Sequence, residues 1–137
     1  MTIYRIFAIL TTASVMSASL AQTKHRVVVD LFSAGPDAYL STLGNIENLQ
    51  KALGDNPAQV EVVCYGKGID MILNHNNPLT ARIEKLHKAG IAFSACRNTL
   101  NHRHISKDQI FPFVVVVDAG IAEVMRKEEA GWSYLRR

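Results

Sequence analysis

The sequence predicts an α/β fold in which helices cover both faces of a parallel sheet. Short β-branched runs alternate with segments whose apolar residues recur at helical spacing, and glycines or prolines separate the two. Because strands joined through helices form right-handed crossovers, the sheet is expected to be parallel. Apolar residues make up 48% of the 137 residues, which excludes a collagen-like, coiled-coil or wholly disordered chain.

The first predicted strand covers residues 26–33, a β-branched and aromatic run that ends before Gly35 and Pro36. A helix is expected next, because apolar side chains recur every three or four positions and Gly54 stands where a C-terminal cap belongs. These apolar side chains are Tyr39, Leu43, Ile46, Leu49 and Leu53. Residues 60–65 read as a second strand.

The middle of the chain continues the alternation. Residues 69–73 are expected to begin a short helix, and a longer helix should start with Asn77 as its cap and end at Gly90. A third strand over residues 91–95 ends at Cys96. Residues 97–104 are polar and are expected to form a loop or a short helix.

The last segments complete the pattern. Ser106 and Gln109 have the spacing of a capping box. The run 113–117 is the most hydrophobic after the N-terminal segment and is predicted to be a central strand. Residues 121–125 have helical spacing, and residues 132–135 are long enough only for a final strand or an anchored tail.

Residues 1–21 are predicted to be a secretory signal peptide. A cation at Arg5 precedes an apolar run, and Ser19 and Ala21 occupy the small-residue positions before a cleavage site. The alternative is a membrane anchor, which needs about 20 apolar residues and therefore a longer run than this one. Residues 22–137 are expected to form one domain that is periplasmic or secreted and does not bind the membrane after cleavage.

Composition narrows the classes of partner and cofactor. Lys and Arg total 15 against 12 Asp and Glu, so no polybasic surface of the kind that binds nucleic acid is predicted. Two cysteines are too few for a disulfide-dense scaffold, and neither belongs to a C-x-x-C pair of a zinc site. The sequence implies no cofactor.

The residues that close the four main strands indicate where a site would lie. Loops at the carboxyl ends of parallel strands form the ligand crevice in such sheets. Ser33, Tyr65, Cys96 and Asp118 end these strands. Cys96 is therefore predicted to lie on this rim.

Cys96 is the candidate nucleophile. A thiol reacts as the thiolate, which neighbouring cations and helix N-termini favour. Arg97 is adjacent, His102 and His104 follow shortly after, and any helix starting near Asn98 would point its amides at the sulfur. An uncovered, ionised Cys96 is the reactive interpretation, and a buried structural thiol is the alternative.

Three other interpretations of these side chains stay open. Cys64 alternates with valines in its strand and is expected to be a core residue. If the second and third strands are neighbours, Cys64 and Cys96 come within disulfide range. Cys96, His102 and His104 also have a C-x5-H-x-H spacing, which fits a metal only in an irregular loop, so no metal site is predicted.

The chain resembles the DsrE-like (DsrE/DsrF-like) family, which is named for intracellular sulfur oxidation. The resemblance rests on A-C-R-N-T-L around Cys96 and on the closing G-W-S-Y at residues 131–134, and it covers residues 26–137. It implies a five-stranded, mainly parallel α/β/α sandwich that forms dimers, trimers or hexamers. It also implies sulfur relay, in which the matching cysteine accepts sulfane sulfur as a persulfide and passes it to a partner protein.

Two functions are therefore weighed. In the first, Cys96 carries a persulfide, Arg97 stabilises the anion, and His102 or His104 adds positive potential or shuttles a proton. In the second, the protein is a non-catalytic, oligomeric small-ligand-binding or assembly module of the cell envelope, and Cys96 is incidental. Relay members of the family are cytoplasmic, whereas this chain is expected to be exported.

Overall fold

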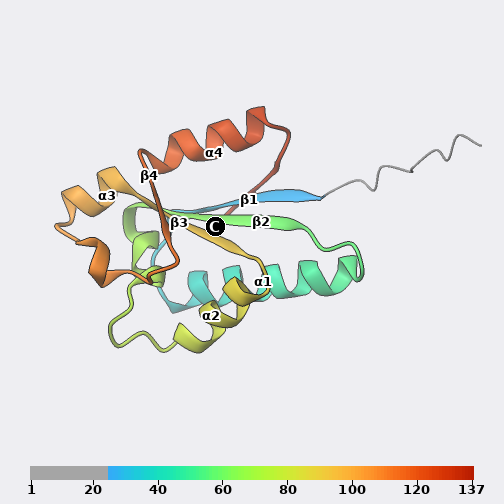
Figure 1. Ribbon diagram of the computed structural model, residues 1–137, viewed down its shortest axis with the longest axis horizontal. Coiled ribbons are helices and arrows are strands. Elements are labelled where there is room, and N and C mark those ends of the chain that lie inside the picture. The colour runs from blue at the N-terminus through green and yellow to red at the C-terminus, as the bar shows by residue number, and fades with distance from the viewer. Residues whose placement is uncertain (1–24) are drawn as a thin grey trace, which may run out of the picture.

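The computed structural model describes residues 25–137 as one sheet with helices on both faces (Figure 1). The predicted signal peptide lies outside the described residues. All strand pairs are parallel, and the order is β4-β3-β2-β1-β5. The strands are β1 (Arg26–Leu31), β2 (Gln59–Cys64), β3 (Ala92–Cys96), β4 (Val115–Val117) and β5 (Ser133–Arg136). The predicted five-stranded α/β sandwich is confirmed.

The direction in which each connection crosses the sheet decides which face its helix covers. The connections after β1 and β2 place α1 (Pro36–Leu53) and α2 (Thr80–Lys88) below the sheet in Figure 1. The connection after β4 returns across the sheet to β5, so α4 (Gly120–Glu129) lies on the opposite face. Shorter elements are η1 (Gly66–Ile72), α3 (Arg97–His102) and η2 (Lys107–Gln109).

The predicted helix boundaries are largely confirmed. Gly54 caps α1 with a φ of 55°, and Ser106 and Gln109 form the predicted capping box at η2. The helix predicted from Asn77 begins later, at Thr80. Asn77 instead holds a turn, because its side-chain amide donates to the carbonyls of Met71 and Leu73 at 2.9 and 2.7 Å.

The prediction of a central strand over residues 113–117 is wrong. β4 spans only Val115–Val117 and forms one edge of the sheet, pairing with β3 alone. The apolar run does not need a central position: Val114 is buried before the strand begins, and Phe113 stacks on His87 with ring centroids 4.0 Å apart. Val115, in the strand, is 61% exposed.

The two faces of the sheet are unequal. A large apolar cluster fills the space between the sheet and the α1 and α2 side, and it includes Leu31, Cys64 and Phe93. Under α4 the fully buried cluster is only Val28, Val63 and Val124. Polar side chains fill much of the remaining α4 face, so this is the face on which chemistry is expected.

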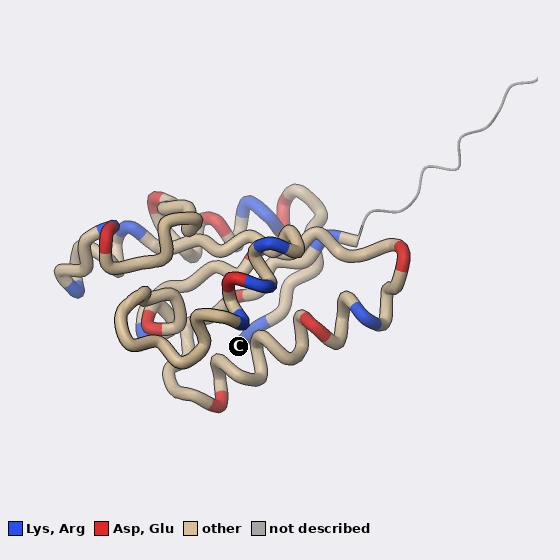
Figure 2. Tube along the Cα trace, turned by 60° about the horizontal axis from the view of Figure 1, so that its bottom comes forward, with Lys and Arg blue, Asp and Glu red and all other residues tan. Residues whose placement is uncertain are grey.

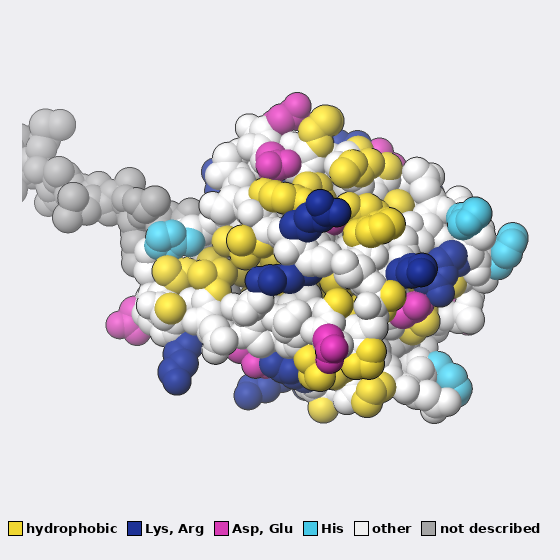
Figure 3. All heavy atoms as spheres, turned by 180° about the vertical axis from the view of Figure 1, so that it is seen from behind, with side chains coloured by type: hydrophobic (Ala, Val, Ile, Leu, Met, Phe, Trp, Pro, Cys, Tyr) yellow, Lys and Arg dark blue, Asp and Glu magenta, His cyan; other side chains and the backbone are white. Residues whose placement is uncertain are grey.

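Charges of both signs are interspersed along the chain. Figure 2 shows the Lys and Arg positions alternating with Asp and Glu positions over helices and loops. The space-filling view from behind shows apolar side chains in separate patches with charged side chains between them (Figure 3). Among residues 25–137, no helix is long and apolar enough to cross a membrane.

Candidate functional site at the end of β3

Cys96 is the last residue of β3 and stands at the N-cap position of α3, so it lies on the predicted rim. Alternation along the strand decides which way its side chain points. Ala95 belongs to the large apolar cluster on the α1 and α2 side, so Cys96 faces the other side, towards α4. Cys96 belongs to neither apolar cluster.

Cys96 is less exposed than the sequence predicts. Its exposed fraction is 5%, so the expectation of an uncovered sulfhydryl is wrong. The groups that lower its pKa are polar, however: the backbone N–H groups of Gly120, Thr99 and Asn98 and the hydroxyl of Thr99. These donors favour the thiolate over the neutral thiol.

These donors determine the acidity of the thiol. Burial favours the neutral thiol and would raise the pKa of Cys96, but the hydrogen bonds from Gly120 and then from Thr99 and Asn98 outweigh it. The net pKa of Cys96 lies below its ordinary value. Asn98 and Thr99 are in the first turn of α3, and Gly120 is the first residue of α4, so two helix N-termini meet at one sulfur.

Gly120 and Thr99 are functional residues that sequence reasoning missed. A Cβ on Gly120 would lie 3.0 Å from the Tyr65 side chain, so glycine allows α4 to approach the rim closely. The Thr99 hydroxyl also accepts a hydrogen bond from the Gly66 N–H at 3.0 Å, which joins α3 to the end of β2. The signal for Gly120 in the sequence is a glycine three residues after the apolar run 113–117.

A partly buried ion pair holds α4 over the sheet. Lys127 Nζ lies 2.6 Å from Glu61 Oε2, and Ser94 donates to the other oxygen of Glu61 at 2.9 Å. The same ammonium lies 4.3 Å from the ring centroid of Trp132. Because Glu61 and Ser94 belong to the strands below, these contacts set the position of the helix whose first N–H reaches Cys96.

A second polar group lies on the same face, at β1. The Asp30 carboxylate is 5% exposed and accepts a hydrogen bond from the Tyr134 hydroxyl at 2.7 Å, and its other oxygen has no hydrogen-bond partner among the described residues. Burial and the neighbouring Asp30 carboxylate raise the pKa of Tyr65. These contacts tie β5 to the centre of the sheet.

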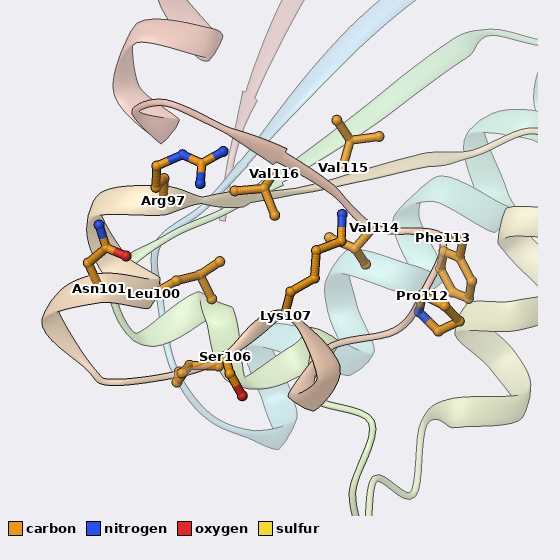
Figure 4. Close-up of a pocket in the computed structure, with 11 residues that line it drawn as sticks. Arg97, Leu100, Asn101, Ser106, Lys107, Pro112, Phe113, Val114, Val115 and Val116 are labelled. Carbon is orange, nitrogen blue, oxygen red and sulfur yellow. The ribbon is translucent and has the colours of Figure 1, made fainter.

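The other predicted site residues take different positions. Arg97 is exposed beside Cys96, at the mouth of a groove between α3, η2 and β4 (Figure 4). His102 ends α3, and His104 lies beyond it with a φ of 53°; both are exposed. The groups that lower the pKa of Cys96 are amides and a hydroxyl, so none of these three side chains is needed for the shift.

Cys64 lies on the opposite face of the sheet from Cys96. It pairs in register with Ala95, is fully buried in the large apolar cluster, and has a pKa raised by burial. The expectation that Cys64 is a core residue is confirmed. Both thiols are free, and their opposite facing explains why adjacent strands do not bring them into a disulfide.

A metal site is not assembled in the described part of the chain. Across residues 25–137, no group of three or more His, Cys, Asp and Glu side chains is arranged to hold an ion. The C-x5-H-x-H spacing crosses α3, and it leaves both histidines exposed at the end of the helix away from Cys96.

Comparison with solved structures gives the same fold in three proteins. The protein of unknown function MTH1491 from Methanobacterium thermoautotrophicum is 27% identical, with a TM-score of 0.74 over 83% of this chain and 100% of that chain. The ychN protein from E. coli is 13% identical, with a TM-score of 0.68 over 83% and 99% of the two chains. BT1422 from Bacteroides thetaiotaomicron, a conserved protein of unknown function, is 13% identical, with a TM-score of 0.66 over 82% and 94%.

The family assignment comes from the sequence as a whole. No curated protein matches the chain. The model of the DsrE/DsrF-like family matches residues 11–136, which include every described helix and strand. The chain therefore belongs to the DsrE/DsrF-like family, which is associated with sulfur relay.

Proposed function

We propose that this protein is a sulfur carrier that holds sulfane sulfur as a persulfide on Cys96. The observation that supports the proposal most directly is the lowered pKa of Cys96, caused by amide and hydroxyl donors that outweigh burial. A lowered pKa increases the thiolate fraction near neutral pH, and the thiolate is the nucleophile in sulfur exchange. The same donors also stabilise a persulfide anion at this position.

The proposed transfer balances without an external oxidant or reductant. With thiosulfate as donor, the Cys96 thiolate attacks the sulfane sulfur, a new S–S bond forms, and sulfite leaves with the electron pair of the broken S–S bond. In the second step an acceptor thiolate attacks the terminal sulfur, and Cys96 leaves as the thiolate. Because Cys96 is only 5% exposed, the groups over its sulfur must move aside for a protein acceptor.

Arg97, His102 and His104 are proposed to act around this step and not in setting the pKa. Arg97 directly follows Cys96 and is exposed, so it is available to attract an anionic donor or acceptor. The two histidines at the end of α3 add positive potential when protonated and can carry a proton.

Intact mass spectrometry after incubation with thiosulfate or polysulfide tests the carrier role. The wild type should gain the mass of one sulfur atom, and Cys96→Ser should gain none. Cys64→Ala is the matched control and should gain sulfur like the wild type, because Cys64 is fully buried and its pKa is raised. Equal labelling of wild type and Cys96→Ser would contradict the proposal.

Export is proposed for the full chain. The apolar segment and small-residue cleavage positions within residues 1–21 support cleavage after Ala21. The mature protein recovered from the periplasm or medium should begin at Gln22 by intact mass. A full-length mass in the cytoplasmic fraction alone would contradict this proposal.

Self-association is proposed on the exposed apolar side chains of α4. Ile121 and Met125 are one helical turn apart and are 64% and 53% exposed. This surface also supports the second candidate function, an oligomeric ligand-binding or assembly module. Sedimentation velocity of Ile121→Glu tests it: a smaller particle than the wild type is expected, and an unchanged sedimentation coefficient would contradict the proposed interface.

A further inference from the structure

Of the residues used in the proposed thiol chemistry, Arg97 lines the groove between α3, η2 and β4. The groove has a volume of about 550 Å³. Its floor is apolar, formed by Leu100, Ile105, Val114 and Val116. Cys96 does not line it, so a small sulfur donor resting in the groove is not placed for attack by the thiolate. A ligand bound in this groove can reach the Cys96 thiol only if it is long enough to extend out of the groove.

Two cations at the groove form no ion pair with an acidic side chain of the described residues. Figure 4 shows the Arg97 guanidinium and the Lys107 ammonium extending into the groove from different elements, on either side of Val116. Within residues 25–137, every ion pair is formed by a cation other than Arg97 and Lys107. The cations so used are Arg82, Arg103, Arg126 and Lys127. Arg97 and Lys107 are therefore available to an external carboxylate.

One wall of the groove is the free edge of the sheet. Among the strands that the structure describes, β4 pairs with β3 alone, so its other side presents main-chain donors and acceptors without a neighbouring strand. Val115 is 61% exposed at this edge. An extended peptide that adds a strand to such an edge gains main-chain hydrogen bonds along its length.

We infer that this groove binds an extended acidic segment of a partner protein, which adds to the free edge of β4 and places its carboxylates at Arg97 and Lys107. Charge complementarity selects an acidic segment, and the open strand edge selects an extended one. The identity of the partner rests on the proposed function: it is the protein that gives sulfur to Cys96 or accepts sulfur from it.

The register of the sheet would bring such a partner segment close to Cys96. Val117, the last residue of β4, lies opposite Cys96. An added strand beside β4 is two strand spacings, about 10 Å, from β3 at that level. A partner segment that follows β4 towards its carboxyl end therefore arrives beside the rim, where a cysteine a few residues further on can reach the thiol.

Peptide binding to the Cys96→Ser protein tests the inference without any sulfur transfer. The probe is a fluorescein-labelled peptide of alternating Glu and Val, and the same peptide with Lys in place of Glu is the charge control. Fluorescence anisotropy should show binding of the acidic peptide only. Arg97→Gln and Lys107→Gln should each weaken it about threefold and the double variant about tenfold, whereas Lys51→Gln, in the last turn of α1, should leave it unchanged.

Hydrogen exchange locates the bound peptide. Slower exchange of the β4 amides on addition of the acidic peptide is the expected result. Equal binding of the two peptides, no effect of the double variant, or no protection in β4 would each overturn the inference. Dissociation of a self-associated wild type by the double variant would also overturn it, because the groove would then be a contact between copies. A failure of Cys96 to take up sulfur leaves the peptide result intact, so the two proposals fail separately.

Discussion

The two cysteines end neighbouring strands and yet have opposite chemistry. Cys64, at the end of β2, is fully buried in the apolar cluster on the α1 and α2 side, and burial raises its pKa. Cys96, at the end of β3, is also mostly buried, but hydrogen-bond donors lower its pKa. Cys64 is the more deeply buried of the two, and only Cys96 has hydrogen-bond donors that lower its pKa, so both burial and the polarity of the surroundings separate the two thiols.

The difference extends to the two faces of the sheet. The α1 and α2 face holds most of the buried apolar side chains, whereas the α4 face carries Asp30, Glu61, Ser94 and the donors around Cys96. The first face mainly stabilises the fold, and the second mainly positions the thiol. Substitutions on the two faces should therefore separate stability from thiol acidity.

The largest expected loss of stability comes from a substitution on the α1 and α2 face. Phe93→Ala removes a side chain that is 1% exposed and should lower the free energy of unfolding by about 3–5 kcal/mol, measured by urea denaturation. The pKa of Cys96 should stay the same in the folded variant, because Phe93 lies on the opposite face. A clear rise in that pKa would show that the two faces are not independent.

Removing the cation that anchors α4 should lower the stability of the fold and raise the pKa of Cys96. Lys127→Met leaves the buried Glu61 carboxylate without its 2.6 Å partner and should cost about 2 kcal/mol of stability. The pKa of Cys96 should rise, because α4 then holds the Gly120 N–H less firmly. Glu61→Gln combined with Lys127→Met should restore part of both losses, and strict additivity in this double-mutant cycle would contradict the coupling.

The Gly120 hydrogen bond can be removed alone. Gly120→Pro takes away the N–H at the first position of α4, where proline is tolerated, and should raise the pKa of Cys96. Gly120→Ala has the same 3.0 Å Cβ contact with Tyr65 but keeps the N–H, so it should change the pKa less. Equal shifts in the two variants would assign the effect to packing instead. Alkylation rates as a function of pH provide the measurement.

The two thiols should also contribute to the free energy of unfolding with opposite dependences on pH. The lowered pKa of folded Cys96 adds stability above the unfolded value of about 8.5, and this is lost as the pH falls through the folded pKa. The raised pKa of Cys64 adds stability below about 8.5, and this is lost as the pH rises towards the folded pKa.

Urea unfolding of the single variants between pH 7 and 9.5 separates these contributions. Cys64→Ala should remove a decrease in stability with rising pH, and Cys96→Ser should remove an increase. Each slope is at most about 1.4 kcal/mol per pH unit. Slopes of the same sign would contradict the contrast between the two thiols.

Most of the fold is predictable from the sequence because each element carries its own local signal. The periodicity of α1 and the capping box at η2 depend on residues close together in the chain, and both are confirmed. The edge position of β4 is not a local property, since it depends on which strand each crossover reaches. An apolar run therefore predicts a strand but not its place in the sheet.

The site is predictable only in part for the same reason. Strand-end position identifies Cys96, and the expected helix after it supplies two of the N–H donors. The donor at Gly120 comes from a distant segment and depends on the Lys127–Glu61 pair to hold α4 in place. Nearby cations in the sequence suggested side-chain electrostatics, whereas backbone amides lower the pKa.

The pKa of Cys96 is the most direct test of this account. The rate of iodoacetamide alkylation of the Cys64→Ala protein, measured from pH 5 to 10 with intact mass readout, reports the titration of the remaining thiol. We expect a single titration with a midpoint clearly below the value of about 8.5 for a free cysteine. A midpoint at or above that value, or no alkylation of the folded protein at any pH, would contradict the account.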